Sequence, residues 1–298
     1  MRPPPRTVSI NRGSATTAEP RSSRRPKAPN RGPRALVIDI ETAPIAGYVW
    51  KIWEENVGLD QIIQDCTILS YAAKWIDSDK VIFNSVAGQG AENLHAPGTG
   101  IRNDRPLMAP LRALLNEAQV VITQNGQAFD TKRINARMVV HGFLPPSKYR
   151  ILDTKLIAKR SFAFTSNKLE WMSKILTDEP KHKHGKFPGF ELWAECMKDN
   201  PLAWKEMRTY NIQDVIACEQ VWRKLRAWDP SHINWSTYDW DAVMGCRVCG
   251  SQAVELDGYQ TLQVGVYAQY RCLEPDCGAW SRGRKMLTPK ETRDAKLV

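Results

Sequence analysis

Two acidic side chains stand in an apolar, strand-like segment, where ordinary packing disfavours charge. The segment is ALVIDIET, residues 35–42. Side chains on a strand alternate between two faces, so Asp39 and Glu41 fall on the same side. The opposite face carries Leu36, Ile38 and Ile40. Two neighbouring carboxylates raise each other's cost of ionisation unless a cation lies between them. A hard divalent cation with oxygen ligands suits this pair, which predicts half of a metal site.

A further acid lies in a segment with helical spacing, residues 201 to about 226. The apolar positions are Trp204, Met207, Val215, Cys218, Val221, Trp222 and Leu225. At roughly 100° per residue, Asp214 falls inside this apolar arc, and Tyr210 lies one turn earlier at its edge. An isolated buried carboxylate is strongly unfavourable. Asp214 therefore either bonds a neighbouring Arg or backbone amide, or joins Asp39 and Glu41 around a metal.

A fourth carboxylate, Asp130, follows the short apolar strand AQVVITQ and the turn residues NGQ. A helix is expected from FDTKRINARMVV. Open α/β sheets place their active sites just beyond such strand ends. The alternative is helix capping or a favourable charge in the first helical turn.

Together, these positions resemble the motifs of a known nuclease family. The motifs are Asp39-Ile-Glu41-Thr42, Asn125-x-x-x-Phe129-Asp130 and Tyr210-x-x-x-Asp214. They are similar, in order, to the three motifs of DEDD-type 3′–5′ exonucleases. Thr209 stands where the histidine branch has its His, which favours the tyrosine branch, with the family B DNA polymerase proofreading domains and RNase D. Stand-alone phage exonucleases are also similar around YNIQDV and LRAW. The resemblance covers about residues 34–228.

The resemblance implies an α/β, ribonuclease H-like fold, which is a mixed five-stranded sheet with flanking helices. It also implies two Mg²⁺ or Mn²⁺ ions. Asp39, Glu41 and Asp214 would hold one ion, and Asp39 with Asp130 the other, partly through water. Two such ions about 4 Å apart activate water and stabilise the leaving oxygen of a phosphoryl transfer.

The resemblance further assigns residues to water and substrate. Tyr210 would orient the attacking water, since a phenol with an ordinary pKa of about 10 stays protonated. Asn125 and Phe129 would position or stack on the 3′-terminal nucleotide, and Thr42 would contact it through its backbone. Phe129 has an alternative interpretation as a core residue.

Two cysteine pairs near the C-terminus predict a second metal site. They are Cys246-Arg-Val-Cys249 and Cys272-Leu-Glu-Pro-Asp-Cys277, each followed by glycine. Paired cysteines followed by glycine fit a zinc ribbon with one structural Zn²⁺, although the second pair is spaced more widely than the usual C-x-x-C. Four thiolates leave no position open for water. Two disulfides or unrelated core thiols are the alternatives; disulfides are disfavoured because no secretory signal is evident. The remaining cysteines, Cys66, Cys196 and Cys218, are expected to pack as small apolar groups.

Composition predicts how the chain is divided. The 298 residues carry a net charge of +10, and this length favours about two domains. We predict a disordered basic arm (1–33), an exonuclease domain (34–230), a linker (231–243), a zinc ribbon (244–285) and a tail (286–298). The arm is rich in Arg and Pro and would touch phosphates without reading sequence. No apolar run reaches membrane-spanning length.

Two other polar features are given structural interpretations. Asp153, before KLIAKR, resembles an N-cap more than a metal ligand. The tract KHKHGK, residues 181–186, is interpreted as a solvated basic loop, with a metal tract or phosphate contact as alternatives.

These features favour a two-metal 3′–5′ exonuclease acting on single-stranded DNA ends in replication, repair or recombination. An RNase D-like exoribonuclease is the closest alternative, because nothing identifies a reader of the 2′-hydroxyl. A catalytically silent nucleic-acid adaptor is a third, although all five catalytic-type side chains are present. We expect single-stranded 3′ ends as partners, with a polymerase or another replication protein as a further candidate. The expected location is the cytoplasm of a bacterium or phage-infected host, without secretion.

Overall fold

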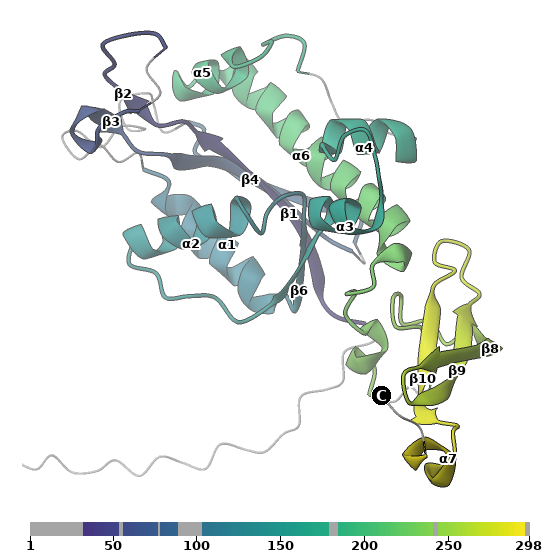
Figure 1. The fold of residues 1–298 in the computed structure, drawn as a ribbon. Helices are drawn as coiled ribbons and strands as arrows, with labels where there is room; N and C mark the ends of the chain where they lie inside the picture. The colour runs from purple at the N-terminus through teal and green to yellow at the C-terminus, as the bar shows by residue number, and fades with distance from the viewer. Residues whose placement is uncertain are drawn as a thin grey trace, which may run out of the picture.

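A computed structural model describes residues 32–53, 56–76, 78–88, 103–178, 184–240 and 244–295. The described residues from 32 to 240 form an α/β unit, and those from 244 to 295 form a C-terminal unit with its own small sheet (Figure 1). The predicted basic arm lies outside the described residues, apart from its last two positions.

The α/β unit is built on a mixed five-stranded sheet, as predicted. In spatial order its strands are β5 (Val81–Ser85), β4 (Thr67–Trp75), β1 (Ala35–Ala43), β6 (Val120–Thr123) and β7 (Arg150–Asp153). The central strand β1 pairs antiparallel with β4 and parallel with β6. β5 runs antiparallel to β4, and β7 parallel to β6. Because a central strand is covered on both faces, the apolar residues of β1 are fully buried.

Helices cover both faces of this sheet (Figure 1). Helices α1 (Arg105–Glu117) and α2 (Asp130–Val140) pack against the face that carries Leu36, Ile38 and Ile40. Helices α3 (Thr154–Ser161), α4 (Leu169–Leu176) and α6 (Pro201–Leu225) share a core with Val37 on the other face. Asp39 and Glu41 therefore project toward α6, as the alternation in β1 predicts.

The long helix α6 matches the predicted helix closely. Asn200 caps it by accepting a hydrogen bond from the Leu202 amide, and Pro201 occupies the first helical position, where its missing N–H is not needed. A shorter helix, α5 (Glu191–Met197), precedes it. Between β1 and β4 the chain also forms two short paired strands, β2 (Ala46–Gly47) and β3 (Ile62–Gln64), which the sequence analysis did not predict.

The C-terminal unit contains three antiparallel strands in the order β10-β9-β8. These are β8 (Val254–Leu262), β9 (Gly265–Cys272) and β10 (Trp280–Met286), followed by the short helix α7 (Lys290–Asp294). This sheet lies beside the C-terminal end of α6 (Figure 1).

Hydrogen bonds beside a buried aromatic stack join the two units. In the segment predicted as a linker, Trp235 is buried and its ring lies 5.5 Å from that of Trp222 on α6. The Trp235 amide donates to the Arg247 carbonyl (2.7 Å), and Arg247 Nη2 donates to the Asp229 carbonyl (2.8 Å). His232 stacks on Trp222, and burial lowers the pKa of its imidazole. The first cysteine pair is thus tied by hydrogen bonds to the end of the α/β unit.

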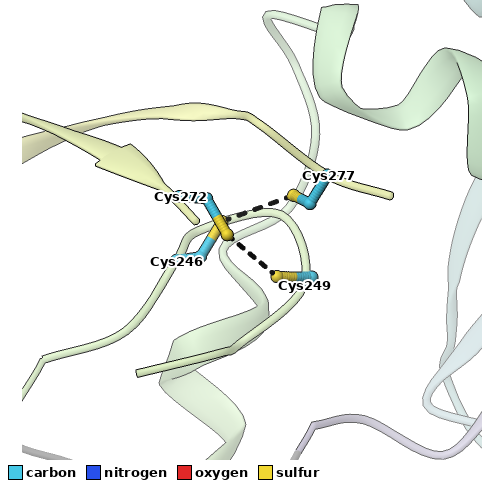
Figure 2. A group of neighbouring side chains, drawn as sticks. All are labelled: Cys246, Cys249, Cys272 and Cys277. Carbon is cyan, nitrogen blue, oxygen red and sulfur yellow. Dashed lines mark hydrogen bonds between the residues drawn. The ribbon is translucent and has the colours of Figure 1, made fainter. Parts of the chain in front are cut away.

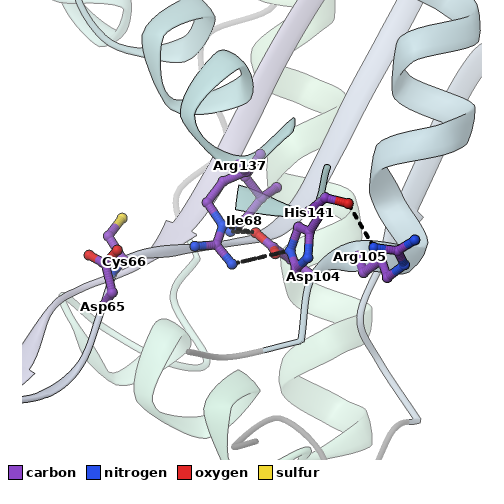
Figure 3. Close-up of polar contacts among 7 residues, drawn as sticks. All are labelled: Asp65, Cys66, Ile68, Asp104, Arg105, Arg137 and His141. Carbon is purple, nitrogen blue, oxygen red and sulfur yellow. Dashed lines mark hydrogen bonds and ion pairs between the residues drawn. The ribbon is translucent and has the colours of Figure 1, made fainter. Parts of the chain in front are cut away.

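A buried ion-pair cluster, centred on Asp104 before α1, ties α1, α2 and β4 together (Figure 3). Its carboxylate accepts from Arg137 Nε (2.8 Å) and Nη2 (2.7 Å), from the Ile68 amide (2.9 Å), and bonds His141 Nε2. The Asp104 and Arg137 side chains are 1% and 3% exposed. The carboxylate is therefore well compensated despite its burial.

Arg137→Ala should lower the free energy of unfolding by roughly 3–5 kcal/mol, because it leaves the buried Asp104 carboxylate without its main counterion. Urea denaturation followed by circular dichroism measures this. The matched control is Lys198→Ala, which removes a largely exposed cation paired with Glu195 and should leave the unfolding midpoint unchanged. Equal midpoints for the two variants would contradict a structural role for the cluster.

Candidate functional site

Three predicted acids converge between β1 and α6. One carboxylate oxygen from each of Asp39, Glu41 and Asp214 lies within 4.8 Å of the others. Asp39 and Glu41 come from the same face of β1, and Asp214 comes from the buried side of α6. Carboxylate oxygens at this spacing suit a hard divalent cation, whereas three like charges without a cation repel. The acidic triad can therefore bind a metal, in line with the predicted metal site.

Asn211, on α6, holds Asp39 in place. It is fully buried, donates through Nδ2 to Asp39 Oδ2 (2.7 Å), and accepts through Oδ1 from the Ser70 hydroxyl on β4 (3.1 Å). Asp39 pairs with Ala72 and Glu41 with Ser70, and the register shifts immediately after Glu41. Such a bulge redirects the strand beyond it. The sequence analysis did not single out Asn211, although it stands next to Tyr210.

Asp130 lies beside the triad without being one of its members. It is the first residue of α2 and is 4% exposed, and its Oδ1 accepts from the Ile40 amide (3.1 Å), between the two acids of β1. Burial raises the pKa of the Asp130 carboxyl to about 6, and the hydrogen bond from Ile40 offsets part of this rise. Phe129 is the N-cap and makes no side-chain cap, so Asp130 does not cap the helix, but it does place an acidic charge in the first helical turn, as the alternative interpretation allowed.

Two aromatic rings pack against Tyr210, which lies one turn before Asp214. Trp193, on α5, donates through Nε1 to Glu41 Oε2 (3.1 Å), and its ring packs edge-on against Tyr210 at 5.8 Å. His184 packs edge-on against both, 5.1 Å from the Tyr210 ring and 5.4 Å from the Trp193 ring. Its Nδ1 donates to the Phe187 carbonyl (2.7 Å). The rings fix the position of Tyr210 and one oxygen of Glu41.

His184 corrects one interpretation of the basic tract 181–186. The tract was taken as a solvated loop, but His184 is half-buried within the aromatic cluster. Residues 181–183 lie outside the described residues. Trp193, which the sequence analysis did not single out, hydrogen-bonds a predicted metal ligand.

The predicted substrate residues lie at the edge of the site. Asn125 has a positive φ of 65°, and its Oδ1 accepts from Lys155 Nζ (3.1 Å). Phe129 is 38% exposed, with the Arg133 guanidinium 5.7 Å from its ring centre. The core interpretation of Phe129 is therefore wrong. Thr42 is half-buried at the bulge that follows Glu41.

Asp153 is confirmed as an N-cap. It accepts from the Lys155 and Leu156 amides at the start of α3. The same carboxylate accepts from the amides of Asn125 (2.9 Å) and Gln127 (3.1 Å). One side chain thus caps a helix and fixes the turn that presents the second motif.

The four paired cysteines converge in the C-terminal unit (Figure 2). Their sulfurs all lie within 4.8 Å of one another, with Cys246 and Cys277 3.8 Å apart and Cys249 and Cys272 3.6 Å apart. These separations are too long for disulfides, whose sulfurs are about 2.0 Å apart. Sulfurs at the corners of a zinc tetrahedron with bonds of about 2.3 Å lie about 3.8 Å apart. The four cysteines are free in the structure and lie close enough together to share one metal ion.

The cysteine sulfurs influence one another's protonation. Hydrogen bonds from Cys249 and Cys277 lower the pKa of the Cys246 thiol. The contact with Cys246 raises the pKa of Cys249 and raises that of Cys277 to about 12. A cation is needed for all four to be thiolates at once. By contrast, Cys66, Cys196 and Cys218 are buried singly in the α/β unit, as predicted.

The interpretation of the site rests on its geometry. Among the described residues, no helix combines the length and apolar character needed to cross a membrane. No protein-family model matches the chain, and no curated protein matches it.

Proposed function

We propose that the chain is a two-metal-dependent 3′–5′ exonuclease that removes nucleotides from single-stranded DNA. The observation that carries this proposal is the convergence of Asp39, Glu41 and Asp214, with Asp130 and Tyr210 beside them. The strand order β5-β4-β1-β6-β7, with the acids on the central strand, supports a ribonuclease H-like fold.

The residues have distinct roles in this proposal. Asp39, Glu41 and Asp214 would hold one Mg²⁺ or Mn²⁺, and Asp39 with Asp130 a second. When bound, such ions activate water and stabilise the leaving oxygen. Asn211 keeps Asp39 oriented toward the metal, and Trp193 does the same for Glu41. Their hydrogen bonds preorganise the ligands, so less rearrangement is needed on binding.

Tyr210 would position the attacking water through its hydroxyl. Trp193 and His184 pack against its ring, so the hydroxyl is held in a fixed position relative to α6. Phe129, partly exposed at the edge of the site, offers a face for the terminal base. Asn125 and the backbone at Thr42 would complete the nucleotide site.

The cysteine cluster would hold one structural Zn²⁺ and make the C-terminal unit a zinc ribbon. Four sulfur ligands would fill the tetrahedron, so this ion would stabilise the fold and take no part in hydrolysis. The α/β unit would then carry the chemistry. No residue in the described sheet of the C-terminal unit is needed for the hydrolytic step.

Digestion of matched DNA and RNA oligonucleotides, labelled at either end, tests the proposal. With Mg²⁺ or Mn²⁺, we expect single-stranded DNA to shorten stepwise from its 3′ end and release nucleoside 5′-monophosphates. Excess EDTA should stop the reaction. Faster RNA digestion would favour the exoribonuclease, whereas internal cuts or digestion from the 5′ end would contradict 3′–5′ exonuclease action.

Tyr210→Phe should slow cleavage by about 10²-fold while leaving the dissociation constant for single-stranded DNA nearly unchanged, because one hydroxyl that orients water is lost. The ring and its contacts with His184 and Trp193 remain. Single-turnover cleavage measures the rate, and anisotropy without divalent metal measures binding. Tyr238→Phe, in the segment after α6, is the control. An equal loss of affinity would make Tyr210 a binding residue instead.

A further inference from the structure

A hollow of about 540 Å³ opens where the C-terminal sheet meets the segment after α6. We call it the C-terminal hollow. Its lining residues are Pro230, Asn234, Gly245, Arg247, Gln260, Gln269, Trp280, Ser281 and Arg282. The lining contains two guanidinium groups, several amides and an indole, and it has no acidic residue. This composition differs from that of the metal site, where carboxylates dominate.

Strand register explains why these side chains share one face. Trp280 lies opposite Arg271, and Arg282 lies opposite Gln269. Residues directly opposite in a sheet point to the same side, as do alternate residues along one strand. Trp280, Arg282 and Gln269 therefore project together. The Arg282 guanidinium lies 4.5 Å from the ring centre of Tyr267, which orients its charge.

Arg247 supplies the second charge from the first cysteine turn. Its Nη2 and Nη1 donate to the carbonyls of Asp229 (2.8 Å) and His232 (3.3 Å). These contacts fix the guanidinium without neutralising it. Neither Arg247 nor Arg282 forms an ion pair with a carboxylate in the described parts of the chain. A positive charge held by neutral partners still attracts an anion.

Two strands of the C-terminal sheet are basic. β9 and β10 carry Arg271, Arg282, Arg284 and Lys285 and contain no Asp or Glu, whereas β8 carries Asp257 and Glu255, which pairs in register with Arg271. Trp280 is 46% exposed, so part of its side chain is open to a ligand. Guanidinium groups suit phosphates, and an exposed indole suits the face of an unpaired base. These groups lie within one hollow.

We propose that the C-terminal hollow binds a nucleotide of single-stranded nucleic acid, upstream of the 3′ end. Arg247 and Arg282 bind its phosphates, Trp280 stacks on its base, and the amides of Gln260 and Gln269 contact base or sugar edges. This inference rests on the proposed exonuclease function, because it assigns a second contact for the same substrate. It also makes substrate length a determinant of affinity.

The length dependence follows from α6. Asp214 and Leu225 are separated by eleven residues of one helix, or about 17 Å along its axis. A stacked strand advances about 3.4 Å per nucleotide, so this distance corresponds to about five nucleotides. The hollow lies beyond that end of the helix, near residues 230–234. A trinucleotide cannot reach both the acidic triad and the C-terminal hollow, whereas a long oligonucleotide can.

The test uses the full-length protein with both Trp280 and Arg282 changed to Ala. Anisotropy with a labelled twenty-nucleotide oligo(dT), in EDTA so that no cleavage occurs, should show affinity falling about tenfold or more. The salt dependence of binding should also weaken, because one phosphate contact is lost. Cleavage of oligo(dT) trinucleotide should stay at the wild-type rate. Zinc content should also be unchanged, which shows that the unit is folded.

A matched control changes Tyr259 and Lys290 to Ala. Tyr259 is exposed on the same sheet but alternates to the side opposite Gln260, and Lys290 is an exposed cation on α7. This variant should bind the long oligonucleotide like the wild type. Equal losses in both double variants would show a general charge or surface effect and would overturn the proposal.

The outcomes separate this inference from the exonuclease proposal. If the wild type cleaves DNA but the Trp280/Arg282 variant binds the long oligonucleotide as well as the wild type does, only the proposal for the C-terminal hollow is overturned. If the wild type cleaves neither DNA nor RNA, yet the variant loses affinity for the long strand, only the exonuclease proposal fails. If the wild type binds no long oligonucleotide, the proposal for the C-terminal hollow is overturned directly.

Discussion

Asp214→Asn and Asp39→Ala should each reduce cleavage of a 3′-labelled oligonucleotide by more than about 10³-fold while the protein stays folded. Both residues contribute oxygens to the triad. Loss of a ligand removes negative charge that would balance the charge of the metal. It also displaces the groups that the metal would hold in place. Direct Mn²⁺ titration should show weaker binding in parallel with the lost activity. Asp178→Asn, an exposed acid outside the site, should leave both measurements unchanged.

The same two variants should stabilise the metal-free protein, although they reduce its activity. Without a cation, three carboxylates within 4.8 Å repel one another. Removing one charge should therefore raise the thermal unfolding midpoint in EDTA, and the difference should shrink or reverse with saturating Mn²⁺. Near wild-type cleavage by either variant would refute the metal-ligand assignment. Lost activity together with a lower midpoint in EDTA would point to misfolding instead.

Cys249→Ser should release zinc and unfold the C-terminal unit. The wild type should contain about one tightly held Zn per chain, and the variant should contain almost none. Few residues form a core there: Cys246, Val248, Cys272 and Ala279 are buried together. A unit of this size rarely folds without its metal. Elemental analysis measures zinc, and limited proteolysis should cut the variant beyond about residue 244.

Activity distinguishes a structural zinc from a catalytic one. The α/β unit has its own sheet and two large buried clusters, so cleavage of very short oligonucleotides by Cys249→Ser should largely survive. Binding of long oligonucleotides should weaken, because the C-terminal hollow disappears with its sheet. Wild-type protein that contains no zinc, or has all four cysteines disulfide-bonded, would remove the zinc ribbon from the proposal.

Local periodicity made much of the architecture predictable. The alternation of β1 placed Asp39 and Glu41 on one face, and the helical spacing of residues 201–226 placed Asp214 toward the core. These inferences need only the geometry of one element. The cysteine pairs were equally accessible, because four thiols with this spacing have few arrangements other than a shared metal or disulfides.

Contacts between distant segments were not predictable in the same way. Trp193 and Glu41 are 152 positions apart, and Asn211 and Asp39 are 172 apart. No periodicity connects such pairs, so their hydrogen bonds depend on how helices dock on the sheet. The position of His184 likewise depends on how residues 184–190 lead into α5. The Asp104 cluster joins three elements and was missed for the same reason.

The aromatic stack after α6 determines where this chain can be divided. Trp235 and His232 cover Trp222, whose side chain is fully buried. A truncation at residue 230 would strip that cover and expose the indole to water, although it removes no β-strand or α-helix of the α/β unit. A cut after residue 240 keeps the stack but leaves the Trp235 amide without the Arg247 carbonyl. The C-terminal unit is thus not a freely portable module. Its exchange between proteins would require the stack to move with the α/β unit and Arg247 to be retained.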